Sequence, residues 1–284
     1  MNQTDFLHRY IFEKRHVRGE LVQLNDSFKQ VITNHDYPEA VQKLIGDLMS
    51  ATCLLTATLK FEGEITVQMQ GNGPVRYVSV NSNHKQQMRG VARVDGDITG
   101  TSISDLIGKG QMVITIMPEI GERYQGIVAL DGDTVAECLE NYFRQSEQLS
   151  TRLWLETDTN ADAPKTAGML IQVLPVAEQN KEEDFQHLEA LTNTITADEM
   201  LNLDAQTLLT RLYHEDNPEL FEPQSVMFKC GCSREKCESA ILNLGSDEIN
   251  HHINTIGPVD IKCDACNTNY HFSIAELQGY LNQH

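Results

Sequence analysis

Apolar residues over the first 175 positions recur with two different periods. A helical period follows Pro38, a residue that the first turn of a helix tolerates, and its apolar positions are Val41, Leu44, Ile45, Leu48 and Met49. Apolar and polar residues then alternate, as is typical of half-buried strands, in five runs: 65–69, 75–80, 88–94, 112–117 and 124–130. Further strands are predicted at 152–156 and 169–174, and a helix at 134–148 with Val135, Cys138, Leu139, Tyr142 and Phe143 on one face.

Turn sequences separate several of these runs. Asn72-Gly73-Pro74 and Asp131-Gly132-Asp133 are rich in the residues that tight turns require. Short connections of this kind favour antiparallel hairpins. The chain is therefore predicted to be of the α+β class, and residues 1–175 to form an N-terminal α/β domain of antiparallel hairpins and packed helices.

Residues 176–225 keep a helical period but differ in charge. Their apolar positions make two faces, Phe185, Leu188, Leu191 and Ile195 in the first and Leu208, Leu209, Leu212 and Tyr213 in the second. Thr196 and Glu199 between them have the spacing of a capping box. The segment holds 12 acidic residues against Lys181 and Arg211, so it carries -10 of the chain's net charge of -19. Short helices with like charges are marginal alone, so we expect this acidic helical linker to lie across the sheet of the N-terminal domain.

Residues 226–284 are a small cysteine-rich module. A hydrophobic core alone rarely stabilises a module of fewer than about 70 residues, so a covalent cross-link or a bound metal ion is expected. Cys230-Gly-Cys232 and Cys263-Asp-Ala-Cys266 are two close pairs separated by 30 residues, and two pairs of sulfurs satisfy one tetrahedral ion. Four soft thiolates favour zinc, with iron as the weaker alternative. The module is therefore predicted to be a zinc-binding domain that holds one Zn²⁺.

The remaining candidate ligands fit this centre less well. His251 and His252 offer a substitute for one sulfur, but they are adjacent and lie in the insert between the pairs. Cys237 is a fifth thiol near the first pair, and it is interpreted as a bystander rather than a ligand. Cys53 and Cys138 lie on apolar helix faces, where thiols are usually core residues. Unligated thiols at all four positions remain the simplest alternative to a metal.

Composition excludes several classes of function. A pI near 4.8 disfavours a nucleic-acid binder, which needs basic residues to neutralise phosphates. No secretory signal is visible, and the longest apolar stretch, 44–59, contains Asp47, so neither export nor membrane insertion is expected. No nucleotide-binding loop or catalytic constellation is found, so neither ATP use nor enzymatic activity is predicted. We expect a cytoplasmic protein, in which disulfides are not the normal scaffold for seven cysteines.

The metal centre is open to two interpretations. A purely structural zinc knuckle is the simpler one. However, Cys-x-Cys spacing brings two sulfurs unusually close, and structural zinc supplies roughly 10–16 kcal/mol of apparent binding free energy, most of what a small module needs to fold. Oxidation of the thiolates would then remove the metal and unfold the module together. The sequence therefore favours a redox-triggered unfolding switch.

Two rival functions use the same cysteines. A thiol–disulfide oxidoreductase would use Cys263 and Cys266, but the βαβ pattern typical of such enzymes does not follow them. A zinc-ribbon regulatory module would bind RNA or protein, but residues 226–284 carry a net charge of -3, which disfavours RNA. The second rival is kept as the alternative function.

The order of these parts resembles a known family. An α/β domain, an acidic linker and Cys-x-Cys-x₃₀-Cys-x₂-Cys near the C-terminus are similar to the thirty-three-kilodalton chaperonin, the redox-regulated bacterial heat-shock holdase family. The resemblance covers essentially the whole chain and includes Gln87-Met-Arg-Gly-Val-Ala-Arg-Val94, Gly121-Glu-Arg-Tyr-Gln-Gly126, Ser146-Glu-Gln-Leu-Ser-Thr-Arg-Leu153 and Phe228-Lys-Cys-Gly-Cys-Ser-Arg-Glu235.

The resemblance implies a function and roles for particular residues. Reduced protein would hold zinc through Cys230, Cys232, Cys263 and Cys266 and be inactive. Oxidation would form the disulfides Cys230–Cys232 and Cys263–Cys266, release zinc and unfold the linker, and the active form would be a homodimer that binds unfolding clients without ATP. Unfolding of the linker would uncover its own apolar faces, so these faces are the candidate client-binding surface: Phe185, Leu188, Leu191, Leu208 and Leu212.

Overall fold

A computed structural model describes residues 5–59, 62–175 and 181–281 of the chain. The described residues up to Lys229 form one compact unit, and those from Cys230 onward form a second. The described part of the acidic segment, from Lys181, lies in the first unit. The division of the chain at 175 and 225 remains a prediction.

The first unit contains an antiparallel sheet, sheet A, in the order β10-β1-β2-β9-β8. Its strands are β1 (Phe6–Phe12), β2 (Val17–Leu24), β8 (Thr151–Asp158), β9 (Lys165–Val173) and β10 (Glu219–Leu220), and β11 (Gln224–Ser225) also pairs with β1. A single 3-10 turn at Glu13–Arg15 joins β1 to β2. The sheet therefore combines the start of the chain with strands more than a hundred residues away.

A second sheet, sheet B, has the order β12-β5-β4-β3-β6-β7. Its strands are β3 (Gly63–Gly71), β4 (Val75–Asn83), β5 (Gln87–Val94), β6 (Gly110–Pro118), β7 (Tyr124–Ala129) and β12 (Met227–Phe228), with the short helix α3 (Ile103–Leu106) before β6. The pairing of β12 with β5 is parallel, and the other pairings are antiparallel. The predicted hairpins are confirmed.

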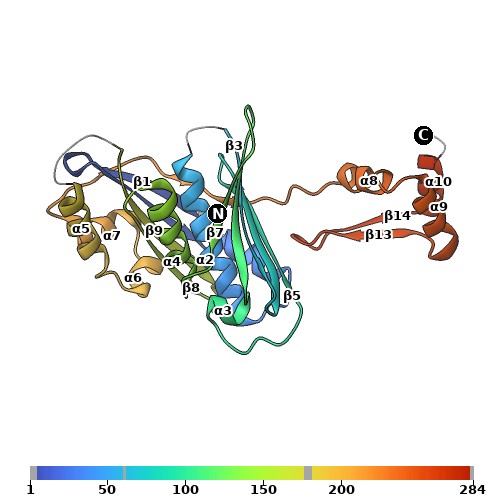
Figure 1. Ribbon diagram of the computed structural model, residues 1–284, viewed down its shortest axis with the longest axis horizontal. Coiled ribbons are helices and arrows are strands. Elements are labelled where there is room, and N and C mark those ends of the chain that lie inside the picture. The colour runs from blue at the N-terminus through green and yellow to red at the C-terminus, as the bar shows by residue number, and fades with distance from the viewer. Residues whose placement is uncertain (1–4, 60–61, 176–180, 282–284) are drawn as a thin grey trace. The chain divides into compact units, whose positions relative to one another are not determined.

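Helix α2 (Glu39–Thr58) packs against strands of both sheets and forms the centre of the first unit (Figure 1). Its residues join those of both sheets in one apolar core, with α1 (Asp26–Thr33) and α4 (Val135–Tyr142) at its edges. Thr134 caps α4, and the predicted helix 134–148 continues as a π-helical turn at Phe143–Glu147. Cys53 and Cys138 are buried in this core, as predicted.

The acidic segment covers the outer face of sheet A (Figure 1). It forms α5 (Lys181–Thr192), α6 (Ala197–Asn202) and α7 (Ala205–Tyr213), and the predicted capping box of Thr196 and Glu199 begins α6. The Tyr213 ring packs edge-on against Phe12 of β1, with 4.9 Å between ring centroids. Strand β9 is buried on both faces because α2 lies on one side and these helices on the other. The expectation that this segment lies across the sheet is confirmed for α5–α7, whereas β10 and β11 in its last part are strands of the sheet itself and residues 176–180 lie outside the described residues.

The second unit contains α8 (Arg234–Leu242), α9 (Ser246–Thr255), the hairpin β13 (Val259–Lys262) and β14 (Asn269–Phe272), and α10 (Ile274–Leu281). Its fully buried apolar cluster among the described residues is small: Ile241, Ile249, Phe272 and Leu277. Arg234 stacks over the Phe272 ring at 4.3 Å from its centroid and pairs with Glu276. Half-buried apolar residues pack around this cluster, but a core of this size rarely stabilises a small unit without a disulfide or a bound metal.

The α+β class is confirmed. Among the described residues, no helix has the length and apolar character that crossing a membrane requires.

One buried carboxyl predicts how the stability of the first unit depends on pH. Glu20 on β2 is 3% exposed, and burial, partly opposed by Arg18 and Arg9, raises its pKa to about 7. Folding therefore favours the protonated form, so stability falls as pH rises from 4.5 towards 7. We expect Glu20→Gln to stabilise the unit by about 2–3 kcal/mol at pH 8 and very little at pH 4. Urea denaturation at both pH values measures this, and an equal effect at both would contradict it.

Candidate metal centre

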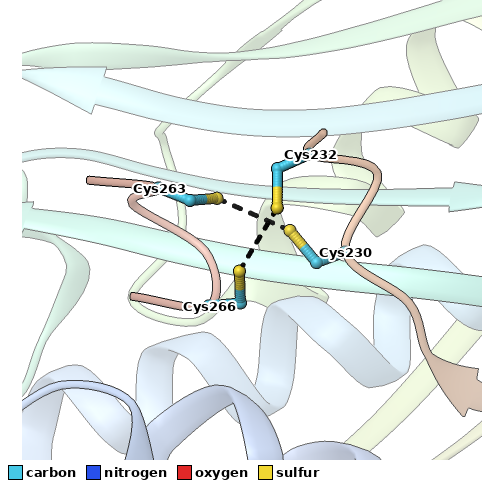
Figure 2. A group of neighbouring side chains, drawn as sticks. All are labelled: Cys230, Cys232, Cys263 and Cys266. Atoms are coloured by element: carbon cyan, nitrogen blue, oxygen red, sulfur yellow. Dashed lines mark hydrogen bonds between the residues drawn. The ribbon is translucent and has the colours of Figure 1, made fainter. Parts of the chain in front are cut away.

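Two loops of the second unit bring four cysteines together (Figure 2). Cys230 and Cys232 lie directly before α8. The start of that helix fixes their loop, because Ser233 accepts a hydrogen bond from the Lys236 N–H and the Lys236 ammonium donates to the Gly231 carbonyl at 2.6 Å. The first pair of sulfurs is thereby held next to the helix N-terminus.

Cys263 and Cys266 lie in the loop between β13 and β14. The Cys263 N–H donates to the Thr268 carbonyl at 2.9 Å, and the Asn267 N–H donates to the Cys263 carbonyl at 2.8 Å. Asn267 adopts a left-handed conformation, with φ of 58°, which a tight turn requires and asparagine tolerates. This turn directs both sulfurs towards the first pair (Figure 2).

The four sulfur atoms have the spacing of a tetrahedral metal site. Cys230 Sγ lies 3.5 Å from Cys263 Sγ, and Cys232 Sγ lies 3.4 Å from Cys266 Sγ. All four lie within 4.8 Å of one another. A tetrahedron with Zn–S bonds of about 2.3 Å places its sulfurs about 3.8 Å apart. The residues therefore fit one zinc ion, and a single iron ion would use the same geometry.

The electrostatics of the cluster also call for a cation. Burial raises the pKa of the Cys230 and Cys263 thiols above the usual value. At Cys266, burial is outweighed by hydrogen bonds from the Thr268 hydroxyl and N–H, which lower the pKa of this thiol to about 6. The site thus favours the thiolate at Cys266 and the neutral thiol at Cys230 and Cys263. A divalent cation supplies the charge that four thiolates need.

The other predicted candidates lie outside this cluster. Cys237 on α8 packs against the small apolar core of the unit, and neither His251 nor His252 on α9 joins the four sulfurs. The Cys263–Cys266 pair occupies a hairpin loop rather than the start of a helix, where low-pKa redox cysteines are commonly found. The cluster therefore consists of the four cysteines selected from their spacing.

The structure also contains features that the sequence did not reveal. The hydroxyls of Thr268 and Tyr270 contact sulfurs of the cluster, which only the turn geometry makes possible. A second group, Glu62, His84 and Glu119, lies next to strand ends of sheet B and is close enough to hold an ion, but both carboxylates are exposed.

The residues predicted to bind clients are covered in this conformation. Phe185, Leu188, Leu208 and Leu212 are buried against sheet A, and Leu191 is half-buried at the edge of the same cluster. Their apolar contacts are with Tyr10, Phe12 and neighbouring residues of the sheet. A client could reach this surface only after the acidic segment leaves the sheet.

Comparison with known proteins places the chain in a family. Residues 5–273 match the family described as Hsp33 protein. The chain is 54% identical over 280 residues to the 33 kDa chaperonin of Pseudoalteromonas translucida, covering 99% of this chain and 100% of the relative, and 52% identical over 275 residues to that of Pectobacterium atrosepticum, covering 96% and 95%. The crystal structure of a 33 kDa chaperonin from Thermotoga maritima has the same fold, with a TM-score of 0.86, 22% identity and 98% of each chain covered. The chain belongs to the Hsp33 protein family.

Proposed function

We propose that this protein is a chaperone of the holdase type, which works in the cytoplasm without ATP and is switched on by oxidation. The observation that carries the proposal is the convergence of four sulfurs on one point in a unit with a very small apolar core. The names of the relatives support the chaperone class. In the reduced, inactive form, one zinc ion would be held by Cys230, Cys232, Cys263 and Cys266.

Bound zinc would keep all four sulfurs deprotonated and cross-link the two loops that carry them. Oxidation removes these ligands. Each pair of thiolates gives two electrons to one hydrogen peroxide, which takes up two protons and leaves as two water molecules while one S–S bond forms. We propose the pairs Cys230–Cys232 and Cys263–Cys266, in agreement with the family resemblance. The second unit then loses its cross-link and unfolds.

Arginines of the first unit hold the acidic segment on sheet A. Arg15, in the turn between β1 and β2, pairs with Asp184 on α5 at 2.5 Å and with Asp216 beyond α7 at 2.6 Å. We call this group the arginine clasp. Arg152 on β8 adds a pair with Glu189 at 2.9 Å. Three carboxylates of the acidic segment thus share two arginines while it is docked, which offsets part of their charge, and they repel their neighbours once it leaves.

The chain itself offers a route from the zinc unit to the acidic segment. After α7, strands β10 and β11 pair with β1, and β12 pairs with β5. Cys230 follows β12 after a single residue. These pairings are only two residues long, so unfolding that begins at Cys230 has few hydrogen bonds to break before it reaches α7. Release of α5–α7 would expose their apolar faces and the outer face of sheet A to clients.

A chaperone assay tests this function. Oxidised, zinc-free protein should suppress light scattering by a heat-unfolded client without ATP, whereas reduced, zinc-loaded protein should not. The active form is expected to be a homodimer, and light scattering of the protein alone would measure its mass. Neither nucleic acid nor membranes should compete with clients for binding. Failure of the oxidised protein to suppress aggregation would refute the proposed function.

The arginine clasp gives a separate prediction. Asp216 is 3% exposed, so removing its arginine partner leaves a poorly compensated buried carboxylate. Because Arg15 is itself 30% exposed, we expect Arg15→Gln to destabilise the docked segment by only about 1–3 kcal/mol. Limited proteolysis within 181–217 should become about tenfold faster or more.

Arg76→Gln is the matched control for this substitution. Arg76 pairs with Asp95 at 3.2 Å on sheet B, and both side chains are largely exposed, so cleavage of the acidic segment should be unchanged. Equal cleavage rates in the Arg15→Gln and Arg76→Gln variants would show that the clasp does not hold the segment.

A further inference from the structure

Two hydroxyl groups next to the cysteine cluster have no role in the function proposed above. We propose that Thr268 and Tyr270 are positioning residues that set how readily the four-sulfur centre reacts with peroxide and how tightly it holds zinc. The inference rests on the proposed zinc site. It concerns how readily peroxide removes zinc from the centre, and not whether peroxide does so.

Tyr270 connects one cysteine loop to the other. It lies on β14, where it pairs with Ile261 of β13, and its hydroxyl donates to Cys232 Sγ at 3.1 Å. The hairpin carries Cys263 and Cys266, whereas Cys232 belongs to the loop before α8. This hydrogen bond therefore crosses the cluster and fixes Cys232 relative to the opposite pair.

Thr268 acts on the sulfur of its own loop. Its hydroxyl lies 3.2 Å from Cys266 Sγ. A metal-bound thiolate has no proton, so the hydroxyl must be the donor in the loaded site. The backbone of Thr268 is fixed by the hydrogen bond that its carbonyl accepts from the Cys263 N–H. The hydroxyl is therefore held in place by the same turn that positions both cysteines.

The other two sulfurs receive donors of a different kind. The Cys232 N–H donates to Cys230, and the N–H groups of Ala265 and Cys266 donate to Cys263. These donors belong to the backbone of the two cysteine loops, so no side-chain substitution removes them. Within the described part of the chain, Thr268 and Tyr270 supply the side-chain hydroxyls that contact the cluster. Substitution of these two residues can therefore change the hydrogen bonding to the sulfurs.

A hydrogen bond to a thiolate withdraws electron density from sulfur. Four thiolates and one Zn²⁺ carry a net charge of -2, so such donors also stabilise the loaded site. In the reaction with peroxide, the thiolate forms an S–O bond as the O–O bond breaks and hydroxide leaves. A second thiolate then displaces hydroxide from this sulfur to form the disulfide. Lower electron density slows the first step, so the two hydroxyls should protect Cys232 and Cys266.

The test uses the full-length, zinc-loaded chain with Thr268→Val and Tyr270→Phe, which remove the hydroxyls and nearly preserve shape. Zinc release under hydrogen peroxide is followed with a chromogenic chelator, and zinc affinity is measured by competition with a chelator of known affinity. Thr255→Val and Tyr280→Phe are matched controls in the same unit, because the Thr255 hydroxyl bonds the His251 carbonyl and Tyr280 bonds Glu238. Thr268→Ser keeps the hydroxyl.

We expect each test variant to release zinc about three- to tenfold faster and to bind zinc about tenfold more weakly, with the controls and Thr268→Ser close to the original chain. Unchanged rates and affinities in both test variants, or equal changes in the controls, would overturn the inference. Failure of the original chain to bind zinc, or to lose it under peroxide, would instead refute the proposed function. The two failures are therefore distinguishable.

Discussion

Replacing Cys263 by serine is expected to unfold the second compact unit of the reduced protein and to leave the first unit folded. The buried apolar cluster described in this unit has only four residues, whereas structural zinc contributes roughly 10–16 kcal/mol to small domains. Loss of one of four ligands removes much of that contribution. The first unit has its own large core and should keep its stability.

Hydrogen exchange measured by mass spectrometry checks this prediction peptide by peptide. Amides of α8, α9 and the β13–β14 hairpin should lose protection by several orders of magnitude, and those of β3, β4 and β9 should not. Cys237→Ser is the matched control, because it makes the same substitution at a thiol outside the cluster. Full protection of this unit in the Cys263→Ser variant, equal to that in the original chain, would show that zinc does not stabilise it.

Replacing Leu208 by aspartate should release the acidic segment without any change at the metal centre. Leu208 on α7 is 1% exposed and lies in the apolar cluster between α5–α7 and the outer face of sheet A. Burying an unpaired carboxylate there costs more than about 3 kcal/mol. The reduced, zinc-loaded variant should then suppress client aggregation without oxidant. Gln206→Asp adds the same charge at an exposed position of the same helix and should remain inactive.

The chain contains its own reporter of this release. Trp154 on β8 is its single tryptophan, and its indole N–H donates to the Asn193 side chain, at the end of α5, at 3.0 Å. Undocking exposes the indole to water and shifts its emission to longer wavelength. A Leu208→Asp variant with shifted emission, full zinc content and no chaperone activity would show that undocking of the segment is not sufficient for client binding.

Local patterns predicted much of the fold. Strands of sheet B face the core on one side only, so their alternation is visible in the sequence. The capping box at Thr196 needs only neighbouring residues and was equally visible. Strands β1 and β2 were missed, since β2 is buried almost throughout and shows no simple alternation. For β9, covered on both faces, only the second half was predicted.

The sequence likewise predicted only part of the candidate site and of its connection to the acidic segment. The four cysteines were identified from spacing because metal ligation demands close pairs. The arginine clasp was not identified, because Arg15 is separated from its two partners by 169 and 201 positions in the sequence. From the sequence alone, the acidic charge was therefore expected only to make the short helices marginal by themselves. The structure shows that arginines of the first unit offset part of the repulsion while the segment is docked.

Oxidation of the cysteine cluster is expected to release the acidic segment. The most direct test treats reduced, zinc-loaded protein with hydrogen peroxide at a heat-shock temperature and follows zinc release and Trp154 emission in the same sample. One zinc should be lost together with four thiols, and the Trp154 emission should shift to longer wavelength at the same rate or just after. Complete loss of zinc and of the four thiols with unshifted Trp154 emission would contradict it.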